Sequence, residues 1–280
     1  MLPSPISHIE LEGRKLYVKR DDLIDPFLAG NKFRKFYSLL QTPSEKYTTL
    51  ISYGGTQSNA MLALASLCQK KKWKFIYYSK PLSKVQKEEN EGNLFESIQL
   101  GMEHIIIEYE LYRDFIASLR VTIDESTFII DQGGADILAK EGIRILADEI
   151  RNNDLGIKSL ALPSGTGTTA LFLAVALPEY KVYTTAVIGD ACYLRVQMQA
   201  LNSIPKNLII LENTQKYPFG KPQSIFLNIY EKFLACGIEF DLLYAPLMWK
   251  NLLESVPEKF IYIHSGGVSG NKSMLKRYAL

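Results

Sequence analysis

Short apolar runs alternate along this chain with segments of helical periodicity, and this rhythm constrains the fold more than any other feature of the sequence. Apolar runs bounded by turn residues are typical of buried strands, and apolar residues at every third or fourth position are typical of amphipathic helices. The alternation predicts βα units on mostly parallel, doubly wound sheets, which is an α/β fold. Strands are predicted at 48–55 with a turn at its end, 74–80, 104–110, 126–131, 158–164, 180–189, 207–214 and 259–267, and helices at 56–70, 90–100 and 135–153.

The chain has 280 residues, 47% of them hydrophobic, which is enough for a large core in one compact unit or in two lobes. Its formal net charge of +2 gives no reason to expect a nucleic-acid or acidic-membrane partner. The N-terminal segment lacks the basic start and apolar run of a signal peptide, and no stretch approaches the roughly 18 apolar residues that span a bilayer. The cytoplasm is therefore the expected location.

The three cysteines and the three histidines are scattered through the chain. No pair of them has the spacing that metal ligands require, so we expect no metal site. Cys68, Cys192 and Cys236 are too widely spaced to suggest a disulfide framework, and we expect them to be reduced thiols in the core.

Three predicted strands run into turns that are rich in glycine and hydroxyl side chains: SYGGTQSNA (52–60), LPSGTGTTA (162–170) and YIHSGGVSG (262–270). Doubly wound sheets bind ligands at the carboxyl ends of their strands, where turns and helix N-termini supply unpaired backbone N–H groups. The three turns are therefore the first places to look for a site.

The turn at 164–169 has two interpretations. It can be an ordinary strand-to-helix turn with hydroxyl caps, or it can hold a phosphate, because glycines let the backbone approach an anion. It is not a P-loop, since no GK[ST] follows. It does match GxGxxA through Gly165, Gly167 and Ala170, with Asp190 after the next strand, so a nicotinamide- or flavin-dependent oxidoreductase stays open. That alternative gives no role to the other two turns.

Four segments in a fixed order carry a resemblance: KRDDL (19–23), AGNKFRK (29–35), GGTQSNA (54–60) and SGTGTT (164–169). Together they resemble the fold type II pyridoxal-phosphate enzymes, whose fold is that of the tryptophan synthase β chain, and most closely the 1-aminocyclopropane-1-carboxylate deaminase and D-cysteine desulfhydrase family. The resemblance covers about residues 3 to 270. It implies pyridoxal 5'-phosphate as cofactor, a small amino acid as substrate and a homodimer. It also implies a larger cofactor-binding lobe from 1–36 and 142–280, and a smaller α/β lobe from 37–141.

The resemblance places the cofactor in the larger lobe. The family's covalently bound lysine corresponds to Lys32, and a second lysine, which meets the cofactor phosphate, corresponds to Lys35. Lys35 can also be an ordinary solvated helix lysine. The phosphate is expected in the turn formed by Ser164, Gly165, Thr166, Gly167, Thr168 and Thr169.

In TQSNA, the family's asparagine corresponds to Asn59, which is expected to bond the phenolic oxygen of the cofactor. Ser58 and Gln57 are expected, with Asn59, to meet the substrate, whose carboxylate suits a helix N-terminus. Ser58 can also be a plain helix cap. The family's active-site tyrosine corresponds to Tyr244, a candidate proton donor or acceptor beside Lys32 and Ser58, although a tyrosine at the end of a strand is also common.

The chain departs from the family at three positions. Ala60 stands where the deaminases have histidine, Ala245 stands where a glutamate or threonine faces the pyridine nitrogen, and Phe219 stands at a second active-site tyrosine. A carboxylate beside that nitrogen deepens the electron sink, and opening a cyclopropane ring needs the deeper sink more than loss of a good leaving group does. We therefore predict α,β-elimination that gives ammonia and a 2-oxo acid, as in D-cysteine desulfhydrases. 1-Aminocyclopropane-1-carboxylate deamination and a cofactor-binding protein with little catalysis are the alternatives within the resemblance.

Overall fold

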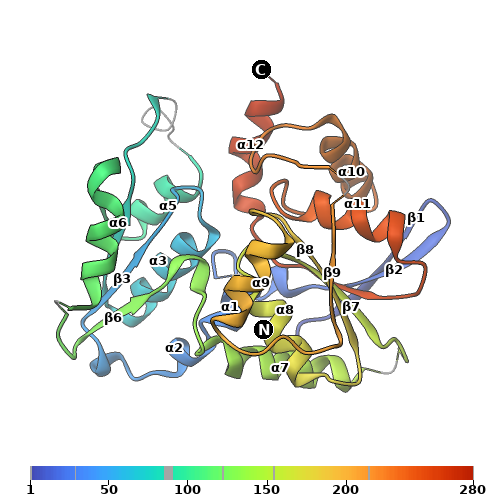
Figure 1. The fold of residues 1–280 in the computed structure, drawn as a ribbon, viewed down its shortest axis with the longest axis horizontal. Helices are drawn as coiled ribbons and strands as arrows, with labels where there is room; N and C mark the ends of the chain where they lie inside the picture. Colours follow the sequence, from blue (N-terminus) through green and yellow to red (C-terminus); the bar gives the residue numbers. More distant parts are fainter. Residues whose placement is uncertain are drawn as a thin grey trace.

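Two β-sheets lie side by side in the computed structural model, which describes residues 2–28, 30–84, 91–121, 123–153, 155–213 and 215–279 (Figure 1). One sheet has six described strands in the order β1-β2-β10-β7-β8-β9, and the other has four in the order β5-β4-β3-β6. All pairings are parallel except that of β1 with β2. The predicted α/β fold with mostly parallel sheets is therefore confirmed.

The six-stranded sheet draws on both ends of the chain. Its strands are β1 (Ile6–Leu11), β2 (Arg14–Lys19), β7 (Ser159–Ser164), β8 (Lys181–Ala186), β9 (Leu208–Leu211) and β10 (Ile261–Ile263). The helices around it are α7 (Ala139–Arg151), α8 (Thr168–Ala176), α9 (Ala191–Gln199), α10 (Ser224–Ala235), α11 (Ala245–Ser255) and α12 (Asn271–Tyr278). Buried side chains of α7 and α8 form one core with the sheet, while those of α10 and α11 form a second core that contains Trp249.

The four-stranded sheet comes from the middle of the chain. Its strands are β3 (Thr49–Tyr53), β4 (Lys74–Ser79), β5 (Met102–Ile106) and β6 (Thr127–Ile130). The helices of this region are α1 (Gly30–Lys35), α2 (Tyr37–Gln41), α3 (Asn59–Lys71), α5 (Asn93–Gln99) and α6 (Tyr109–Ser118). Buried residues of α3 share a core with Leu50 and Phe75, and α6 packs Phe115 and Ile116 against Ile51 in a separate core.

The N-terminal hairpin of β1 and β2 is absent from the sequence prediction. Both strands alternate polar and apolar residues, as expected of a strand pair at the edge of a sheet. Glu12 and Gly13 join them with positive φ angles of 51° and 76°, which is typical of a two-residue hairpin turn. The prediction relied on apolar runs, and these two strands have none.

Other boundaries differ by a few residues. The strand predicted at 104–110 is Met102–Ile106, and Tyr109 already begins α6. The helix predicted at 135–153 is Ala139–Arg151. Asn90 and Thr214, at the ends of two predicted elements, lie outside the described residues. Cys68 is buried as predicted, but Cys192 is exposed because it lies on the outer face of α9, so the prediction of a core thiol there is wrong.

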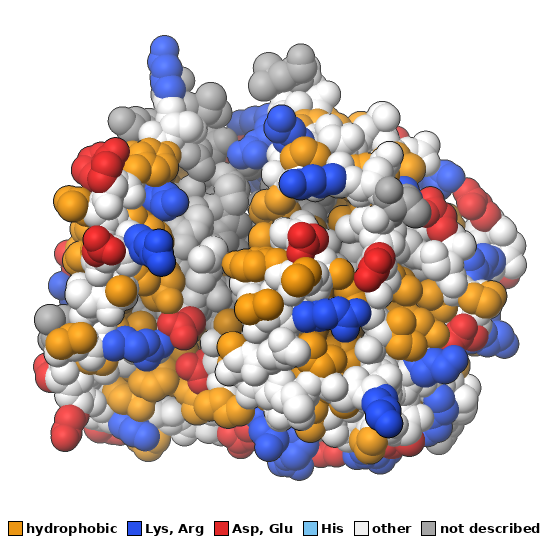
Figure 2. All heavy atoms as spheres, viewed as in Figure 1, with side chains coloured by type: hydrophobic (Ala, Val, Ile, Leu, Met, Phe, Trp, Pro, Cys, Tyr) orange, Lys and Arg blue, Asp and Glu red, His pale blue; other side chains and the backbone are white. Residues whose placement is uncertain are grey.

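The surface carries charges of both signs, interspersed with apolar side chains over the face seen in Figure 2. Among the described residues, no helix is long and apolar enough to cross a membrane. In the same part of the chain, no group of three or more His, Cys, Asp or Glu side chains is arranged to hold a metal ion.

Candidate active site

The three glycine-rich turns all follow the carboxyl ends of strands: one after β3, one after β7 and one after β10. Lys32 lies on the short helix α1, which meets the last of these turns. Gly30 has a φ of +59°, and a Cβ added to it would lie 1.9 Å from the carbonyl oxygen of Ser265. The Asn31 N–H also donates to that oxygen at 3.3 Å. Only glycine therefore fits before Lys32, and the contact fixes α1 against residues 265–269.

A cavity of about 40 Å³ opens between the elements that carry Lys32 and Asn59. It is lined further by Leu62, by Phe27 and by the 265–269 loop. The structure thus brings together the predicted lysine and the predicted asparagine, which are 27 positions apart in the sequence. A larger cavity of about 680 Å³ lies beside β1, β2 and α7 and contains none of the predicted site residues.

Lys32 is half-buried, and its amine donates a hydrogen bond to Asn31 Oδ1 at 3.1 Å. Burial lowers the pKa of Lys32 to about 8, although the negative charge of Asp241 opposes the shift. The neutral, nucleophilic form of the amine is therefore available near neutral pH.

Asp241 is a functional candidate that the sequence prediction missed. It is 4% exposed, and its Oδ1 accepts hydrogen bonds from the N–H groups of Leu243 at 3.1 Å and Tyr244 at 2.6 Å, at the start of α11. Burial raises its pKa to about 6, while the backbone N–H groups and the Lys32 charge oppose the rise. The signal in the sequence was an acidic residue three positions before Tyr244, but it suggests a helix cap. Only the fold places it near Lys32.

Lys35 lies one turn after Lys32 on α1 and is buried. Its amine donates to the carbonyl oxygen of Gly133 at 3.0 Å and to Thr166 Oγ1 at 3.3 Å. Burial, together with the charge of Lys32, holds the pKa of Lys35 well below its usual range. Lys35 is therefore not a solvated surface lysine, and it reaches the 164–169 turn.

The 164–169 turn is built for close approach. Gly167 has a φ of +76°, and a Cβ added there would lie 2.4 Å from Met198 Cε. Thr166 and Thr168 share a hydrogen bond of 2.9 Å between their hydroxyl oxygens. Ser164 already bonds Thr184 Oγ1 at 2.7 Å inside the sheet, so its hydroxyl is less available to a ligand than the prediction assumed.

The turn fits a phosphate. Thr169 is 3% exposed, and its Oγ1 is buried with no hydrogen-bond partner in the described part of the chain. A buried hydroxyl without a partner is costly, and an anion that accepts its proton removes the cost. The start of α8 points its N–H groups toward the same turn, where Lys35 adds a cation. These donors suit the phosphate of pyridoxal 5'-phosphate.

The second glycine-rich turn leads into α3. Ser58 caps this helix by accepting a hydrogen bond from the Met61 N–H at 3.2 Å. The carbonyl oxygen of Gln57 and the side-chain oxygen of Asn59 both accept from Asn93 Nδ2, at 3.1 and 2.8 Å. The capping interpretation of Ser58 is therefore correct, and it is compatible with an anion at the same helix end.

Tyr244 lies close to the 164–169 turn. A Cβ added to Gly165 would lie 3.3 Å from Tyr244 Cε1. Phe219 contacts the same ring edge to face, with centroids 5.3 Å apart. Burial, with the charge of Asp241 second, raises the pKa of Tyr244, so the phenol is neutral over the physiological range. Ala60 and Ala245 are buried at the starts of α3 and α11, where neither side chain offers a polar group.

The oxidoreductase alternative loses its acidic residue. Asp190 Oδ1 accepts a hydrogen bond from the Tyr193 N–H at 2.8 Å and caps α9. That carboxylate therefore has a structural role at the position where the fingerprint expects a ribose ligand.

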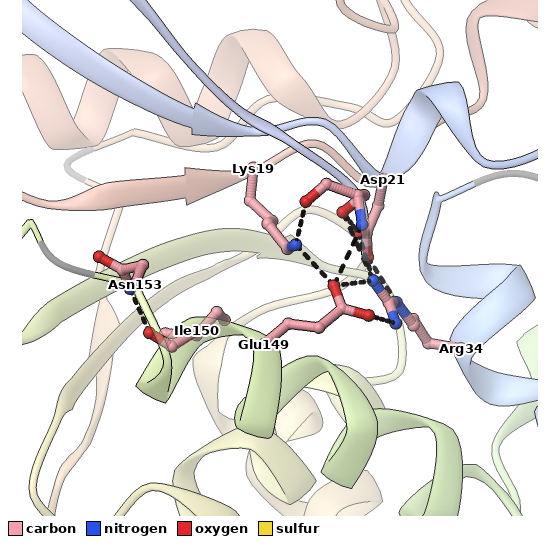
Figure 3. Close-up of polar contacts among 7 residues, drawn as sticks. Lys19, Asp21, Arg34, Glu149, Ile150 and Asn153 are labelled. Atoms are coloured by element: carbon pink, nitrogen blue, oxygen red, sulfur yellow. Dashed lines mark hydrogen bonds and ion pairs between the residues drawn. The ribbon is translucent and has the colours of Figure 1, made fainter. Parts of the chain in front are cut away.

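A buried charge cluster anchors α1 from behind (Figure 3). Arg34, between Lys32 and Lys35 in the sequence, bonds Asp21 and Glu149, each at 2.8 Å, and is fully buried. Glu149, on α7, also accepts from Lys19 at 2.6 Å. Burial alone would raise the pKa of Glu149, but the hydrogen bonds from Arg34 and Lys19 outweigh it and lower the pKa. The cluster fixes the helix that carries both lysines.

Comparisons with known proteins agree with this geometry. The chain is 25% identical over 301 residues to a putative 1-aminocyclopropane-1-carboxylate deaminase of Thermotoga maritima, covering 96% of this chain and 95% of that protein. It is 24% identical over 316 residues to the bifunctional D-cysteine desulfhydrase/1-aminocyclopropane-1-carboxylate deaminase of Arabidopsis thaliana, covering 96% of this chain and 77% of that protein. No protein-family model matches the chain.

Solved structures show the same fold. A crystal structure described as an ACC deaminase homologue superposes with a TM-score of 0.76 at 22% identity, covering 98% of this chain and 93% of that one. The predicted resemblance is thus confirmed: the chain has the fold of the type II pyridoxal-phosphate enzymes, and its sequence relatives carry the names 1-aminocyclopropane-1-carboxylate deaminase and D-cysteine desulfhydrase.

Proposed function

We propose that this chain is a pyridoxal-phosphate-dependent lyase or deaminase that acts on a small amino acid by α,β-elimination. The observation that carries the proposal is the arrangement of two lysines one turn apart on α1. Lys32 faces the cavity that Asn59 lines, and Lys35 reaches Thr166 in the phosphate-like turn. One cofactor with an aldehyde and a phosphate would span these two points.

When bound there, pyridoxal 5'-phosphate supplies an electron sink for the α-carbon of an amino acid. Lys35, Thr169 and the N-terminus of α8 would hold its phosphate, and the Asn59 amide would bond its phenolic oxygen. Lys32 would bind it covalently through the amine and, once displaced by the substrate, would move the proton of the α-carbon. A pKa of about 8 suits an amine that must both take up and release a proton.

The substrate carboxylate would lie at the start of α3. This helix has 13 residues, so its N-terminal N–H groups present a stable positive end to an anion. Ser58 and Gln57 lie at that end and would orient the carboxylate. Tyr244, neutral and close to Gly165, is the candidate that would protonate the leaving group.

Elimination is favoured over ring opening because Phe219 and Ala245 contribute no polar group. In the proposed reaction the α-proton moves to Lys32, and the bond from the β-carbon to an SH, OH or Cl group breaks with its electron pair. Addition of water then releases ammonia and a 2-oxo acid, so that atoms balance. Ring opening of 1-aminocyclopropane-1-carboxylate is the second candidate, and the names of the Thermotoga and Arabidopsis relatives favour it.

The test is turnover by purified protein supplied with pyridoxal 5'-phosphate. D-cysteine, D-serine, β-chloroalanine and the cyclopropane substrate are compared at equal concentrations, with Lys32→Ala as control. We expect the 2-oxo acid to appear fastest from a substrate with a β leaving group. Faster turnover of the cyclopropane substrate would reverse the order of the two candidates, and uptake of the cofactor without any turnover would indicate a binding protein.

We also propose a homodimer in the cytoplasm. Both follow from the family resemblance. Sedimentation equilibrium of the purified chain, 31.7 kDa as a monomer, tests the first, and fractionation of the cells that produce it tests the second.

A further inference from the structure

Asn93 is fully buried at the start of α5, and all three of its side-chain hydrogen bonds point toward the candidate site. Its Nδ2 donates to the Gln57 carbonyl oxygen at 3.1 Å and to Asn59 Oδ1 at 2.8 Å. Its Oδ1 accepts from Ser269 Oγ at 2.8 Å. Ser269 belongs to the loop after β10, so Asn93 connects elements that flank the two sheets.

The chemistry of these partners fixes the orientation of two amides in sequence. A backbone carbonyl oxygen can only accept, so the atom of Asn93 that faces Gln57 must be the nitrogen. That nitrogen also faces Asn59, so the atom that Asn59 presents to it must be the oxygen. The assignment does not depend on which end of either amide was placed where, because each step allows one answer.

The nitrogen of Asn59 must therefore point the other way, into the cavity. A Cβ added to Gly267 would lie 2.4 Å from Asn59 Nδ2, which places this donor against the glycine loop that lines the cavity with Lys32. An amide donor at that point suits an anionic oxygen, and an amide turned by 180° would instead present an acceptor and repel it.

We infer that Asn93 is a positioning residue that holds the Asn59 amide with its N–H groups toward the cofactor's phenolic oxygen. The inference rests on the proposed function. Asn93→Asp tests it most directly, because a carboxylate is repelled by the Gln57 carbonyl and accepts from Asn59, which favours the reversed Asn59 amide. Ser97→Ala is the matched control: Ser97 bonds the Asn93 carbonyl at 2.6 Å and leaves the side-chain amide untouched.

The experiment titrates apo protein with pyridoxal 5'-phosphate and follows the visible absorbance of the bound cofactor against pH. We expect Asn93→Asp and Asn59→Ala each to weaken affinity by about 10- to 100-fold, the size of one hydrogen bond to a charged group. Both should raise the pH midpoint of the visible band, because the phenolic oxygen loses a donor that stabilises its charge. The double variant should bind within about threefold of Asn59→Ala, since Asn93 acts through Asn59. Ser97→Ala should match wild type.

Wild-type affinity in Asn93→Asp, or losses that multiply in the double variant, would overturn the inference and leave the proposed function intact. No uptake by the wild-type protein would overturn the proposed function and the inference with it. Thermal unfolding of each apo variant checks the fold, and if Asn93→Asp does not fold, Asn93→Ala takes its place in the same cycle with the same expected coupling to Asn59.

Discussion

Lys35 Nζ lies 3.3 Å from Thr166 Oγ1, so the helix that carries Lys32 meets the turn after β7 at a single point. The two segments are separated by 131 positions in the sequence. This contact converts a glycine turn of ambiguous meaning into one half of a site, because a phosphate in the turn would lie within reach of a cation one helical turn from a nucleophile.

Replacing Lys35 with methionine tests the phosphate assignment. The variant keeps the bulk of the side chain but loses the charge, so affinity for pyridoxal 5'-phosphate should fall by about 10- to 100-fold. The apo protein should unfold at the same or a higher temperature, since burial of this amine is unfavourable without an anion. Lys140→Met, on the exposed side of α7, is the control. Unchanged affinity in Lys35→Met would remove the phosphate from the 164–169 turn.

Replacing Asp241 with asparagine tests the charge beside Lys32. The asparagine keeps the capping oxygen for Tyr244 but removes the negative charge, which now raises the pKa of Lys32. The pH midpoint for capture of pyridoxal 5'-phosphate should therefore move below about 8. A midpoint that stays in place would mean that the Asp241 charge does not reach the amine.

Asp241 also predicts a pH dependence of stability. Its pKa is about 6 in the folded protein and 3.8 in a model peptide, so the folded state binds more protons between these values. The free energy of unfolding should fall as pH rises from about 4 to about 6, by roughly 1 to 3 kcal/mol. Asp241→Asn should remove this slope in urea titrations. An unchanged slope would assign it to another group.

Removing the charge of Glu149 tests the cluster behind α1. Its pKa lies below 4.5, so its ionised form stabilises the fold above that pH, and the contribution is lost as pH falls through the lowered folded value. Glu149→Gln leaves Lys19 and Arg34 with one carboxylate fewer, so the free energy of unfolding at neutral pH should fall by about 3 kcal/mol. Glu141→Gln, exposed on the same helix, should change it by less than about 0.5 kcal/mol. Equal effects would contradict the anchoring role.

Phe219→Tyr tests the choice between the two candidate reactions. Phe219 is 44% exposed and contacts the Tyr244 ring, so an added hydroxyl has room and lies near the site. We expect the ratio of cyclopropane turnover to elimination to rise, measured as kcat/KM for both substrates in the same preparation. A ratio that falls or stays constant would show that this position does not select the reaction.

The sequence was sufficient for the parts of this account that depend on local patterns. Apolar runs located β3, β7 and β8 within a few residues, and the GNKFRK segment identified Lys32 and Lys35. The β1–β2 hairpin was missed because edge strands alternate polar and apolar residues and so lack a continuous apolar run. Pattern reasoning detects burial on both faces more readily than burial on one.

The rest of the site depends on contacts that no local pattern carries. Asp241 resembles a helix cap in sequence, and its second role arises from proximity to Lys32 across 209 positions. Asn93 begins an unremarkable polar helix, and only its bonds to Gln57 and Asn59 distinguish it. In both cases the residue type is common, and the meaning lies in the partner.

The covalent assignment of Lys32 is the central claim, and one measurement tests it most directly. Purified protein is incubated with pyridoxal 5'-phosphate, reduced with borohydride and digested, and the modified lysine is located by mass spectrometry. We expect the cofactor mass on Lys32, with visible absorbance that is lost on reduction and absent from Lys32→Ala. Modification spread over exposed lysines, or equal labelling in Lys32→Ala, would contradict the account.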